Sequence, residues 1–276
     1  SPIIKYTNKV IYLNDEEIVS IHSNGNYEVT NLKNELQDHE IKELDLKIEE
    51  LEKEGFDHFM LKEIYQQPTT ISESMRGRIN AHDGWVVVGG MQQYINRIMN
   101  AKRIIFAACG TSWHSALVAE YIFEELARIP VEVEYASELR YRNPIIHADD
   151  VIIAISQSGE TADTLAALEM AKEKGALLYG IVNVVGSSIA RFTHCGSYTH
   201  AGPEIGVAST KAFTSQLTVL TLMALNLGHR RGTISEDYFR QLAYALESIP
   251  DKVEKVLQSN EKIKSIAKEI KDVSNA

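Results

Sequence analysis

Three clusters of hydroxyl, amide and glycine residues in this 276-residue chain could bind an anionic ligand. They occupy residues 109–112, 156–161 and 201–211, and each follows a short apolar run and precedes a stretch with helical character. Side-chain hydroxyls, backbone N–H groups and the positive end of a helix dipole can hold an anion without a lysine or an arginine. The sequence therefore predicts that ligand chemistry is concentrated at turns from strand to helix.

The second cluster carries the strongest signal. Its sequence, Ser-Gln-Ser-Gly-Glu-Thr at 156–161, offers three hydroxyls, a glycine that permits close backbone approach, and the start of a helix. This combination suits a phosphate monoester. A helix-capping box in which Thr161 and Thr164 compete as caps would account for one hydroxyl but not for three. We therefore favour the phosphate site.

The first cluster is open to two interpretations. Gly110 follows Cys109 and allows a tight bend, and Thr111 and Ser112 place hydroxyls where unpaired N–H groups favour an anion. Ser112 could equally be no more than the residue that caps the helix. Both interpretations stay open at this point.

The third cluster contains two glycines and a proline, which build a rigid irregular loop. Val207, Ala208 and Ser209 would offer backbone groups and one hydroxyl at the start of a long helix, an arrangement that suits the hydroxyl edge of a sugar. The alternative is a tight structural connection, with Lys211 as an exposed or interface charge.

Composition and patterns exclude several classes of protein. The chain has 28 Lys and Arg against 38 Asp and Glu, a net charge of −10, which argues against a nucleic-acid-binding surface. Neither the P-loop pattern nor the glycine pattern of dinucleotide-binding proteins occurs. No run approaches the roughly 18 apolar residues of a membrane span, and two cysteines make no disulfide framework. The histidines and Cys195 lack zinc-ligand spacing. We expect a cytoplasmic protein that binds neither membranes nor nucleic acid.

Alternation of apolar runs with helical stretches predicts the fold class. Near-continuous apolar strands separated by helices are typical of an α/β protein whose parallel sheet is covered on both faces. We therefore expect a three-layer αβα domain with a five-stranded parallel sheet, followed by peripheral helices at 235–248 and from 251 to about 273. The expected strands are 103–108, 131–135, 151–156, 177–183 and 196–200, and the expected helices between them are 113–128, 161–174 and 207–228.

The first 68 residues have a different character. Apolar runs at 10–13, 18–21 and 27–30 predict a small β-meander, which is marginal by itself and points to a domain whose remainder is missing. Residues 33–63 are rich in acidic side chains and indicate a solvated linker. Within that linker a helical spacing ends at Gly55, and a second helix is expected from Asp57 to Tyr65, closed by Pro68. The helical spacing consists of Ile41, Leu44, Ile48 and Leu51.

The three clusters, taken in order, resemble the first sugar isomerase (SIS) domain of the glutamine–fructose-6-phosphate aminotransferase family, the glucosamine-6-phosphate synthases. Residues 58–68 are similar to the interdomain segment of that family, and residues 1–4 resemble the end of its glutaminase domain. The resemblance implies a site for fructose 6-phosphate or glucosamine 6-phosphate, with no metal or organic cofactor. It implies phosphate contacts from Ser156, Gln157, Ser158 and Thr161, nearby contacts from Cys109, Gly110, Thr111 and Ser112, and sugar contacts from Val207, Ala208 and Ser209.

The resemblance also implies a division of the chain and limits its chemistry. It assigns residues 1–55 to the tail of a glutaminase domain with a linker, 56–91 to an interdomain helical segment, 92–232 to the first SIS domain, and 233–276 to helices leading to a missing second SIS domain. The family's glutaminase uses an N-terminal cysteine nucleophile, whereas this chain opens with Ser1 and is expected to contain only the end of that domain. In the family the isomerase Glu, His and Lys belong to the second SIS domain and the C-terminal tail.

We therefore expect no catalytic residue in this chain. The expectation is a fragment of a homodimeric enzyme that binds sugar phosphate beside its glutaminase and second SIS domains and is inactive alone. Two alternatives stay open. The first is a stand-alone SIS sensor through which a sugar phosphate regulates a partner, and the second is a purely structural or dimerisation unit.

Overall fold

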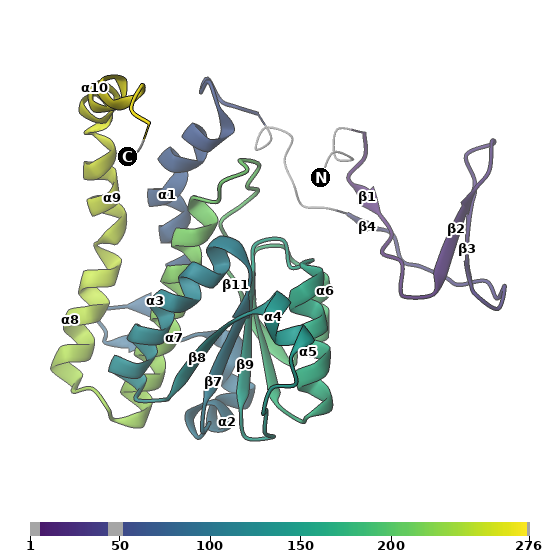
Figure 1. The fold of residues 1–276 in the computed structure, drawn as a ribbon, viewed down its shortest axis with the longest axis horizontal. Coiled ribbons are helices and arrows are strands. Elements are labelled where there is room, and N and C mark those ends of the chain that lie inside the picture. Colours follow the sequence, from purple (N-terminus) through teal and green to yellow (C-terminus); the bar gives the residue numbers. More distant parts are fainter. Residues whose placement is uncertain (1–5, 44–51, 275–276) are drawn as a thin grey trace. The chain divides into compact units, whose positions relative to one another are not determined.

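The computed structural model describes residues 6–43 and 52–274. The chain divides into two compact units, Ser1–Gly55 and Phe56–Ala276 (Figure 1). No helix in the described ranges is long and apolar enough to cross a membrane.

The first unit contains two antiparallel strand pairs. β2 (Glu17–Ile21) and β3 (Tyr27–Asn31) form a hairpin, and β1 (Lys9–Val10) pairs with β4 (Lys42–Glu43). The predicted three-stranded meander is therefore wrong, because β1 finds its partner in the stretch interpreted as a solvated linker. Lys9 lies directly opposite Glu43, and opposite charges in register favour this pairing. The helical spacing predicted in the same linker falls largely on residues 44–51, outside the described residues.

The second unit contains the predicted five-stranded parallel sheet and its covering helices (Figure 1). The strands lie in the order β11-β10-β9-β7-β8, and every neighbouring pair is parallel. The three-layer α/β architecture is confirmed. The strands are β7 (Ile104–Ala108), β8 (Val131–Tyr135), β9 (Val151–Ser156), β10 (Leu177–Val182) and β11 (Cys195–Tyr198).

The helices of this unit, in chain order, are α1 (Phe59–Met75), α2 (Ile95–Met99), α3 (Gly110–Ala127), α4 (Ala136–Tyr141), α5 (Ala162–Glu173), α6 (Ser188–Phe192), α7 (Lys211–Arg231), α8 (Glu236–Glu247), α9 (Ile249–Leu257) and α10 (Asn260–Ile270). A short antiparallel pair, β5 (Ile79–Asn80) with β6 (Trp85–Val86), and a 3-10 helix, η3 (Gly89–Tyr94), lie between α1 and α2.

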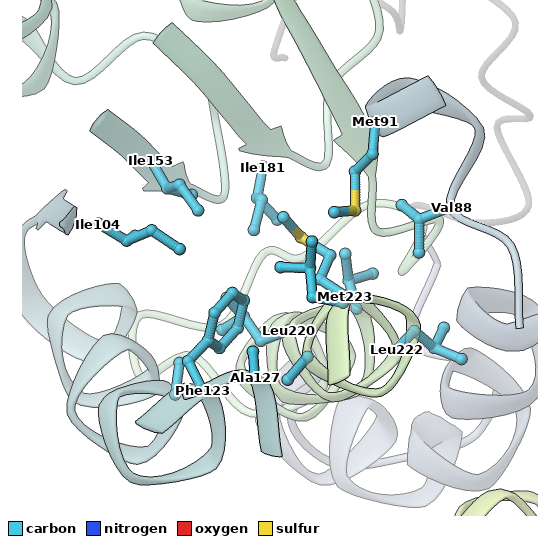
Figure 2. Close-up of a cluster of buried hydrophobic side chains, with 14 of the residues drawn as sticks. Val88, Met91, Ile104, Phe123, Ala127, Ile153, Ile181, Leu220, Leu222 and Met223 are labelled. Carbon is cyan, nitrogen blue, oxygen red and sulfur yellow. The ribbon is translucent and has the colours of Figure 1, made fainter. Parts of the chain in front are cut away.

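Alternate residues of each strand face opposite helical layers. In β7, Ile104 and Phe106 pack in the cluster that contains residues of α3 and α7, whereas Ile105 and Ala107 pack against α4, α5 and α6. Figure 2 shows Ile104, Ile153 and Ile181 from three strands pointing toward Phe123 of α3 and Met223 of α7. Burial on both faces explains why the strands are near-continuous apolar runs in the sequence.

Helix α1 continues through Pro68, so the predicted end of this helix is wrong. A proline has no N–H, and in a helix interior the carbonyl four residues earlier loses its usual donor. Here that carbonyl belongs to Ile64, and it accepts a hydrogen bond from the Gln67 side-chain amide at 3.1 Å. The Pro68 carbonyl accepts from the Ser72 hydroxyl at 3.0 Å. Side-chain donors thus support the backbone on both sides of the proline.

Two other helix boundaries differ from the prediction. α3 begins at Gly110 rather than at 113, and α7 begins at Lys211 rather than at 207. The Glu204 carboxylate accepts the N–H groups of Thr210 and Ala212 at 2.9 and 3.1 Å, which fixes the start of α7 after the loop. The long helix predicted after 251 consists of two helices, α9 and α10, and the short helices α4 and α6 had not been predicted.

Candidate functional site

The strand order places a crevice at the carboxyl ends of β7 and β9. These strands are neighbours in the sheet, but the chain leaves β7 into α3 on one face and leaves β9 into α5 on the other. Connections that diverge in this way leave a space beyond the strand ends, where open α/β sheets bind their ligands. The first two hydroxyl clusters of the sequence are these two turns.

A cavity of about 430 Å³ lies at this position. All the residues predicted for the site line it, together with Ile155, and none of these side chains is a carboxylate, a lysine or an arginine. The structure thus brings together three segments that are about 50 residues apart in the sequence. The lining residues are Cys109, Gly110, Thr111, Ser112, Ile155, Ser156, Gln157, Ser158, Thr161, Val207, Ala208 and Ser209.

The second turn is held by hydrogen bonds that its own hydroxyls accept. The Gly159 N–H donates to Ser156 Oγ at 3.0 Å, and the Glu160 N–H donates to Ser158 Oγ at 3.2 Å. Ser156 Oγ lies 2.9 Å from Thr161 Oγ1. A hydroxyl that accepts from the backbone still has its own hydrogen to donate. One hydrogen of the Ser156–Thr161 pair lies between their oxygens, so the turn presents one hydroxyl hydrogen from that pair and one from Ser158, with the oxygen positions already fixed.

The capping-box alternative for this turn is wrong. Thr161 is the N-cap residue of α5, but its side chain makes no capping hydrogen bond and lies against Ser156 instead. Thr164 is completely buried inside α5, and its hydroxyl has no partner in the described part of the chain. Neither threonine therefore performs the role that the alternative required.

Gly159 occupies a position that no other residue type could take without a shift. Its φ is +69°, and a Cβ at this position would lie 2.0 Å from Ser187 Oγ. The Gly159 carbonyl accepts the Ile189 N–H at 2.9 Å, and Glu160 Oε1 accepts the Ser188 N–H at 2.8 Å. The start of α6 therefore holds the second turn in place through hydrogen bonds on the side away from the cavity.

The first turn is the beginning of α3 itself. Cys109 is the N-cap residue, and Ser112 lies inside the first helical turn, so the interpretation of Ser112 as only an N-cap is wrong. Ser112 is 7% exposed, and its Oγ accepts a hydrogen bond from Gln216 Nε2 at 3.0 Å. The N–H groups of a first helical turn lack intrahelical acceptors, so this turn offers backbone donors to the cavity.

Gln216 was missed in the sequence, although a signal for it existed. It lies on the buried stripe of α7 with Ala212, Val219, Leu220 and Met223. A single amide on an otherwise apolar helical face needs hydrogen-bond partners. The sequence does not say which residues those partners are, because Ser112 is 104 positions away.

The third loop is held by a side chain from α1. Glu63 is 2% exposed, and its Oε1 accepts the N–H groups of Ile205 and Gly206 at 2.6 and 3.0 Å. A Cβ on Gly206 would lie 2.5 Å from Glu63 Oε2, so a larger residue there would have to displace the carboxylate. Lys211, expected at the surface or an interface, is buried, and its Nζ lies 2.8 Å from Gln66 Oε1. No local signal in the sequence marks Glu63.

The histidines and Cys195 are not among the residues that line the cavity, although His114 Nδ1 lies 3.0 Å from the carbonyl oxygen of Gly110. Desolvation, and then the charges of Arg78 and Arg76, lower the pKa of His200. Burial raises the pKa of Cys195 to about 12. The described ranges 6–43 and 52–274 contain no group of three or more His, Cys, Asp and Glu residues that could hold a metal.

Comparison with known proteins identifies the central part of the chain. The SIS domain family matches residues 97–226, a range that includes all five strands of the sheet and the three cavity-lining segments. Residues 97–226 are a SIS domain. The SIS domain thus contains every residue that lines the cavity.

The whole chain is similar to glutamine–fructose-6-phosphate aminotransferases, which confirms the predicted resemblance. It is 54% identical over 276 residues to the protein of that name from Chlorobaculum tepidum, of which it covers 45%. It is 54% identical over 268 residues to the protein from Bacteroides thetaiotaomicron, of which it covers 44%. It is 41% identical over 273 residues to glutamine–fructose-6-phosphate aminotransferase 2 from Homo sapiens, of which it covers 40%. The chain therefore spans less than half the length of these relatives.

Two solved structures have a fold similar to that of this chain. The C-terminal domain of glucosamine-fructose-6-phosphate aminotransferase from Francisella tularensis superposes with a TM-score of 0.76 at 35% identity, over 80% of this chain and 62% of that one. A phosphosugar isomerase homologue from Silicibacter pomeroyi gives a TM-score of 0.58 at 23% identity, over 71% of this chain and 55% of that one. The second likeness shows the shared fold alone.

Proposed function

We propose that the cavity of the SIS domain binds fructose 6-phosphate and the product glucosamine 6-phosphate. The proposed parent is a glutamine–fructose-6-phosphate aminotransferase. The observation that carries this proposal is the convergence of two helix starts and three hydroxyl-bearing segments on one cavity of about 430 Å³. The relatives named for this reaction, 54% identical over the whole chain, support the choice of ligand.

In this proposal the phosphate group lies between the starts of α3 and α5. Ser158 and one member of the Ser156–Thr161 pair donate their hydroxyl hydrogens, because the other hydrogen of that pair lies between its two oxygens, and Thr111 and Ser112 donate from the opposite side. The N-terminal ends of the two helices add unpaired N–H groups and positive dipole ends, which stabilise a dianion. Gln157 contributes its amide, and Cys109 and Gly110 complete the wall without adding charge.

The sugar would then extend toward the third loop. Val207 and Ala208 offer backbone groups and Ser209 offers a hydroxyl at that side of the cavity. Sugar hydroxyls both donate and accept hydrogen bonds, so mixed backbone and hydroxyl partners suit them better than a row of donors. The division of roles places the anion at the helix starts and the neutral part of the ligand at the loop.

We assign the remaining segments as the family resemblance implies. Residues 1–55 belong to the end of a glutaminase domain and its linker, 56–91 to an interdomain helical segment, 92–232 to the first SIS domain, and 233–276 to helices leading to a second SIS domain. The parent is a cytoplasmic homodimer. The chemistry of amino transfer belongs to its other domains, and this chain supplies the sugar-phosphate site without catalytic residues.

Calorimetry tests the proposed ligand directly. Titration of the chain with fructose 6-phosphate is expected to give saturable heat, with weaker binding of orthophosphate and no measurable binding of fructose, because the phosphate makes most of the contacts. Ser188→Ala serves as a matched control, since this serine adjoins the second turn but does not line the cavity. Absence of heat at millimolar fructose 6-phosphate would instead favour the structural or dimerisation role.

A second assay tests the division of labour. The chain, incubated with fructose 6-phosphate and ammonia, is expected to form no glucosamine 6-phosphate. Formation of that product by the purified chain would contradict the assignment of the catalytic residues to other domains.

A further inference from the structure

A buried amide behind the cavity connects two helices to one lining hydroxyl. Gln216 of α7 is 1% exposed, and its Nε2 lies 3.0 Å from Ser112 Oγ of α3. Ser115, which is fully buried one turn further along α3, lies 3.1 Å from Gln216 Oε1 through its Oγ and 2.7 Å from the Ser112 carbonyl oxygen. Two of these contacts join side chains across the two helices, and the third joins the Ser115 hydroxyl to the backbone of Ser112.

We infer that Gln216 is a positioning residue that turns the Ser112 hydroxyl hydrogen into the cavity, toward the bound phosphate. The inference rests on the proposed function, because it assigns a role in that same site. Gln216 does not line the cavity and would act only through Ser112.

The direction of the hydrogen bonds carries the argument. A glutamine amide donates only from nitrogen and accepts only at oxygen. The single Ser115 hydroxyl hydrogen lies between two acceptors, the Ser112 carbonyl oxygen at 2.7 Å and Gln216 Oε1 at 3.1 Å. The Gln216 amide nitrogen lies 3.0 Å from Ser112 Oγ and donates to it. The Ser112 hydroxyl has a single hydrogen, and within residues 6–43 and 52–274 that hydroxyl has no second partner. The hydrogen is therefore available on the cavity side.

The opposite amide orientation would have the opposite consequence. Ser112 would then donate its hydrogen to the glutamine oxygen, and its hydroxyl could offer the ligand only lone pairs. A lone pair facing a phosphate oxygen repels it. The two orientations thus predict changes of opposite sign when Gln216 is replaced by an apolar residue, which makes the inference open to direct test.

A double-mutant cycle on fructose 6-phosphate affinity provides that test. Ser112→Ala is expected to weaken binding roughly 10- to 100-fold, because a charged acceptor loses a donor. Gln216→Met, which keeps the volume but removes the donor, is expected to weaken binding roughly 3- to 10-fold and to have no further effect when combined with Ser112→Ala. Unchanged or tighter binding by Gln216→Met, or full additivity in the double variant, would overturn the inference.

A second variant reports on the hydrogen itself. In Gln216→Glu the ionised carboxylate would take the Ser112 hydrogen, whereas the protonated carboxyl could donate to Ser112 as the amide does. The ratio of its dissociation constant to that of the unsubstituted chain should therefore be large at pH 8 and fall toward pH 5.5. Titration of the ligand and of Cys109, His114 and Lys211 cancels in this ratio, because both proteins contain them. A ratio independent of pH would contradict the inference.

Asn226→Asp is the matched control for a carboxylate buried in α7. Asn226 is 3% exposed on the same helix and donates to the Val86 carbonyl at 2.5 Å, away from the cavity. It should lower stability to urea without changing fructose 6-phosphate affinity at any pH. Absence of binding by the unsubstituted chain would overturn the proposed function, and this inference with it. Binding by the unsubstituted chain without coupling between Ser112 and Gln216 would overturn the inference alone.

Discussion

The turns that follow β7 and β9 differ from the loop that follows β11 in how their geometry is fixed. The two turns are the starts of helices, and most of their hydrogen bonds join residues within five positions of each other, as in Ser156 with Gly159 and Thr161. The loop at 202–210 is held by Glu63 of α1, 142 positions from Ile205, and by Glu204 of the loop itself, which accepts the Thr210 N–H. One side of the cavity is therefore built locally, whereas the other side depends in addition on a distant residue, Glu63.

This difference indicates which part of the site has a fixed geometry before a ligand binds. A helix start is set by backbone geometry and by the packed helix behind it, so its donors are aligned before a ligand arrives. An irregular loop has no such repeat, and its position depends on a few side-chain contacts from α1. We expect substitutions at the turns to remove phosphate contacts and substitutions at α1 to move the loop.

The largest effect is expected for Gly159→Ala. The new Cβ would meet Ser187 Oγ at 2.0 Å and would have to adopt a φ of +69°, so the second turn or Ser187 must shift. We expect a loss of about 2–4 kcal/mol in the free energy of unfolding and loss of measurable fructose 6-phosphate binding. Urea denaturation and calorimetry provide the two measurements.

Gly232→Ala is the control for that backbone effect. Gly232 has a φ of +68° with nothing within 4 Å of a Cβ, so only the conformational penalty of about 1 kcal/mol applies. Its affinity for fructose 6-phosphate should be unchanged. If Gly159→Ala and Gly232→Ala lost the same stability and kept the same affinity, the contact with Ser187 would be unimportant.

The next largest effect concerns the hydroxyl donors of the same turn. Ser158→Ala and Thr161→Ala should each weaken sugar-phosphate binding by about 1–3 kcal/mol, the cost of leaving a charged acceptor short of a donor. Stability should change less, because neither hydroxyl fills a buried core position. Unchanged affinity in both variants, measured by calorimetry, would remove these residues from the site.

Glu63→Leu tests the remote support of the third loop. Two backbone N–H groups lose their carboxylate acceptor, which should cost about 2–3 kcal/mol of unfolding free energy. The affinity should fall up to roughly tenfold, equivalent to about 1.4 kcal/mol, because the loop supplies only the sugar contacts. Glu63→Gln keeps one acceptor oxygen and the shape of the side chain, so it should retain much of the stability and of the affinity for fructose 6-phosphate. Equal loss in the two variants would exclude hydrogen bonding as the cause.

The smallest effect is a pH dependence at the start of the third loop. The lowered pKa of His200 means that the unfolded chain, with a histidine pKa near 6.5, binds this proton more readily than the folded chain. Stability should therefore fall as the pH drops below about 6.5 toward the folded pKa. Because His200 is exposed and its charge is screened, this contribution should not exceed about 0.5 kcal/mol.

His200→Asn isolates that contribution, since asparagine tolerates the left-handed φ of 55° at this position. Urea denaturation at pH 7.5 and 5.5 should show a smaller loss of stability in the variant. An identical loss in both proteins would assign the pH dependence to other groups.

The sheet and the two turns could be predicted from the sequence because their signals are local. A strand buried on both faces is an apolar run, and β8 and β9 were predicted with their observed limits. A turn from strand to helix keeps its hydroxyls adjacent in the chain, so the residues at 109–112 and 156–161 could be recognised together. The strand order, which the sequence does not display, determines that these turns meet.

The remaining features depend on partners that are distant in the sequence or on exceptions to local rules. Glu63 and Gln216 form hydrogen bonds with residues more than 100 positions away, and the neighbouring sequence does not indicate which residues these are. Pro68 usually ends a helix, but the Gln67 amide satisfies the carbonyl that the proline leaves without a donor. The pairing of β1 with β4 likewise joins segments more than 30 residues apart.

The uncharged lining of the cavity affects the salt dependence of ligand binding and the rate of association. Binding that relies on dipoles and hydroxyls, without lysine or arginine, should depend only weakly on ionic strength, because there are few fixed cations to screen. The acidic chain also gives no long-range attraction to a dianion, so association should not be accelerated by steering. Discrimination must then come from shape, and a polyphosphate of greater charge gains no advantage over a single ester.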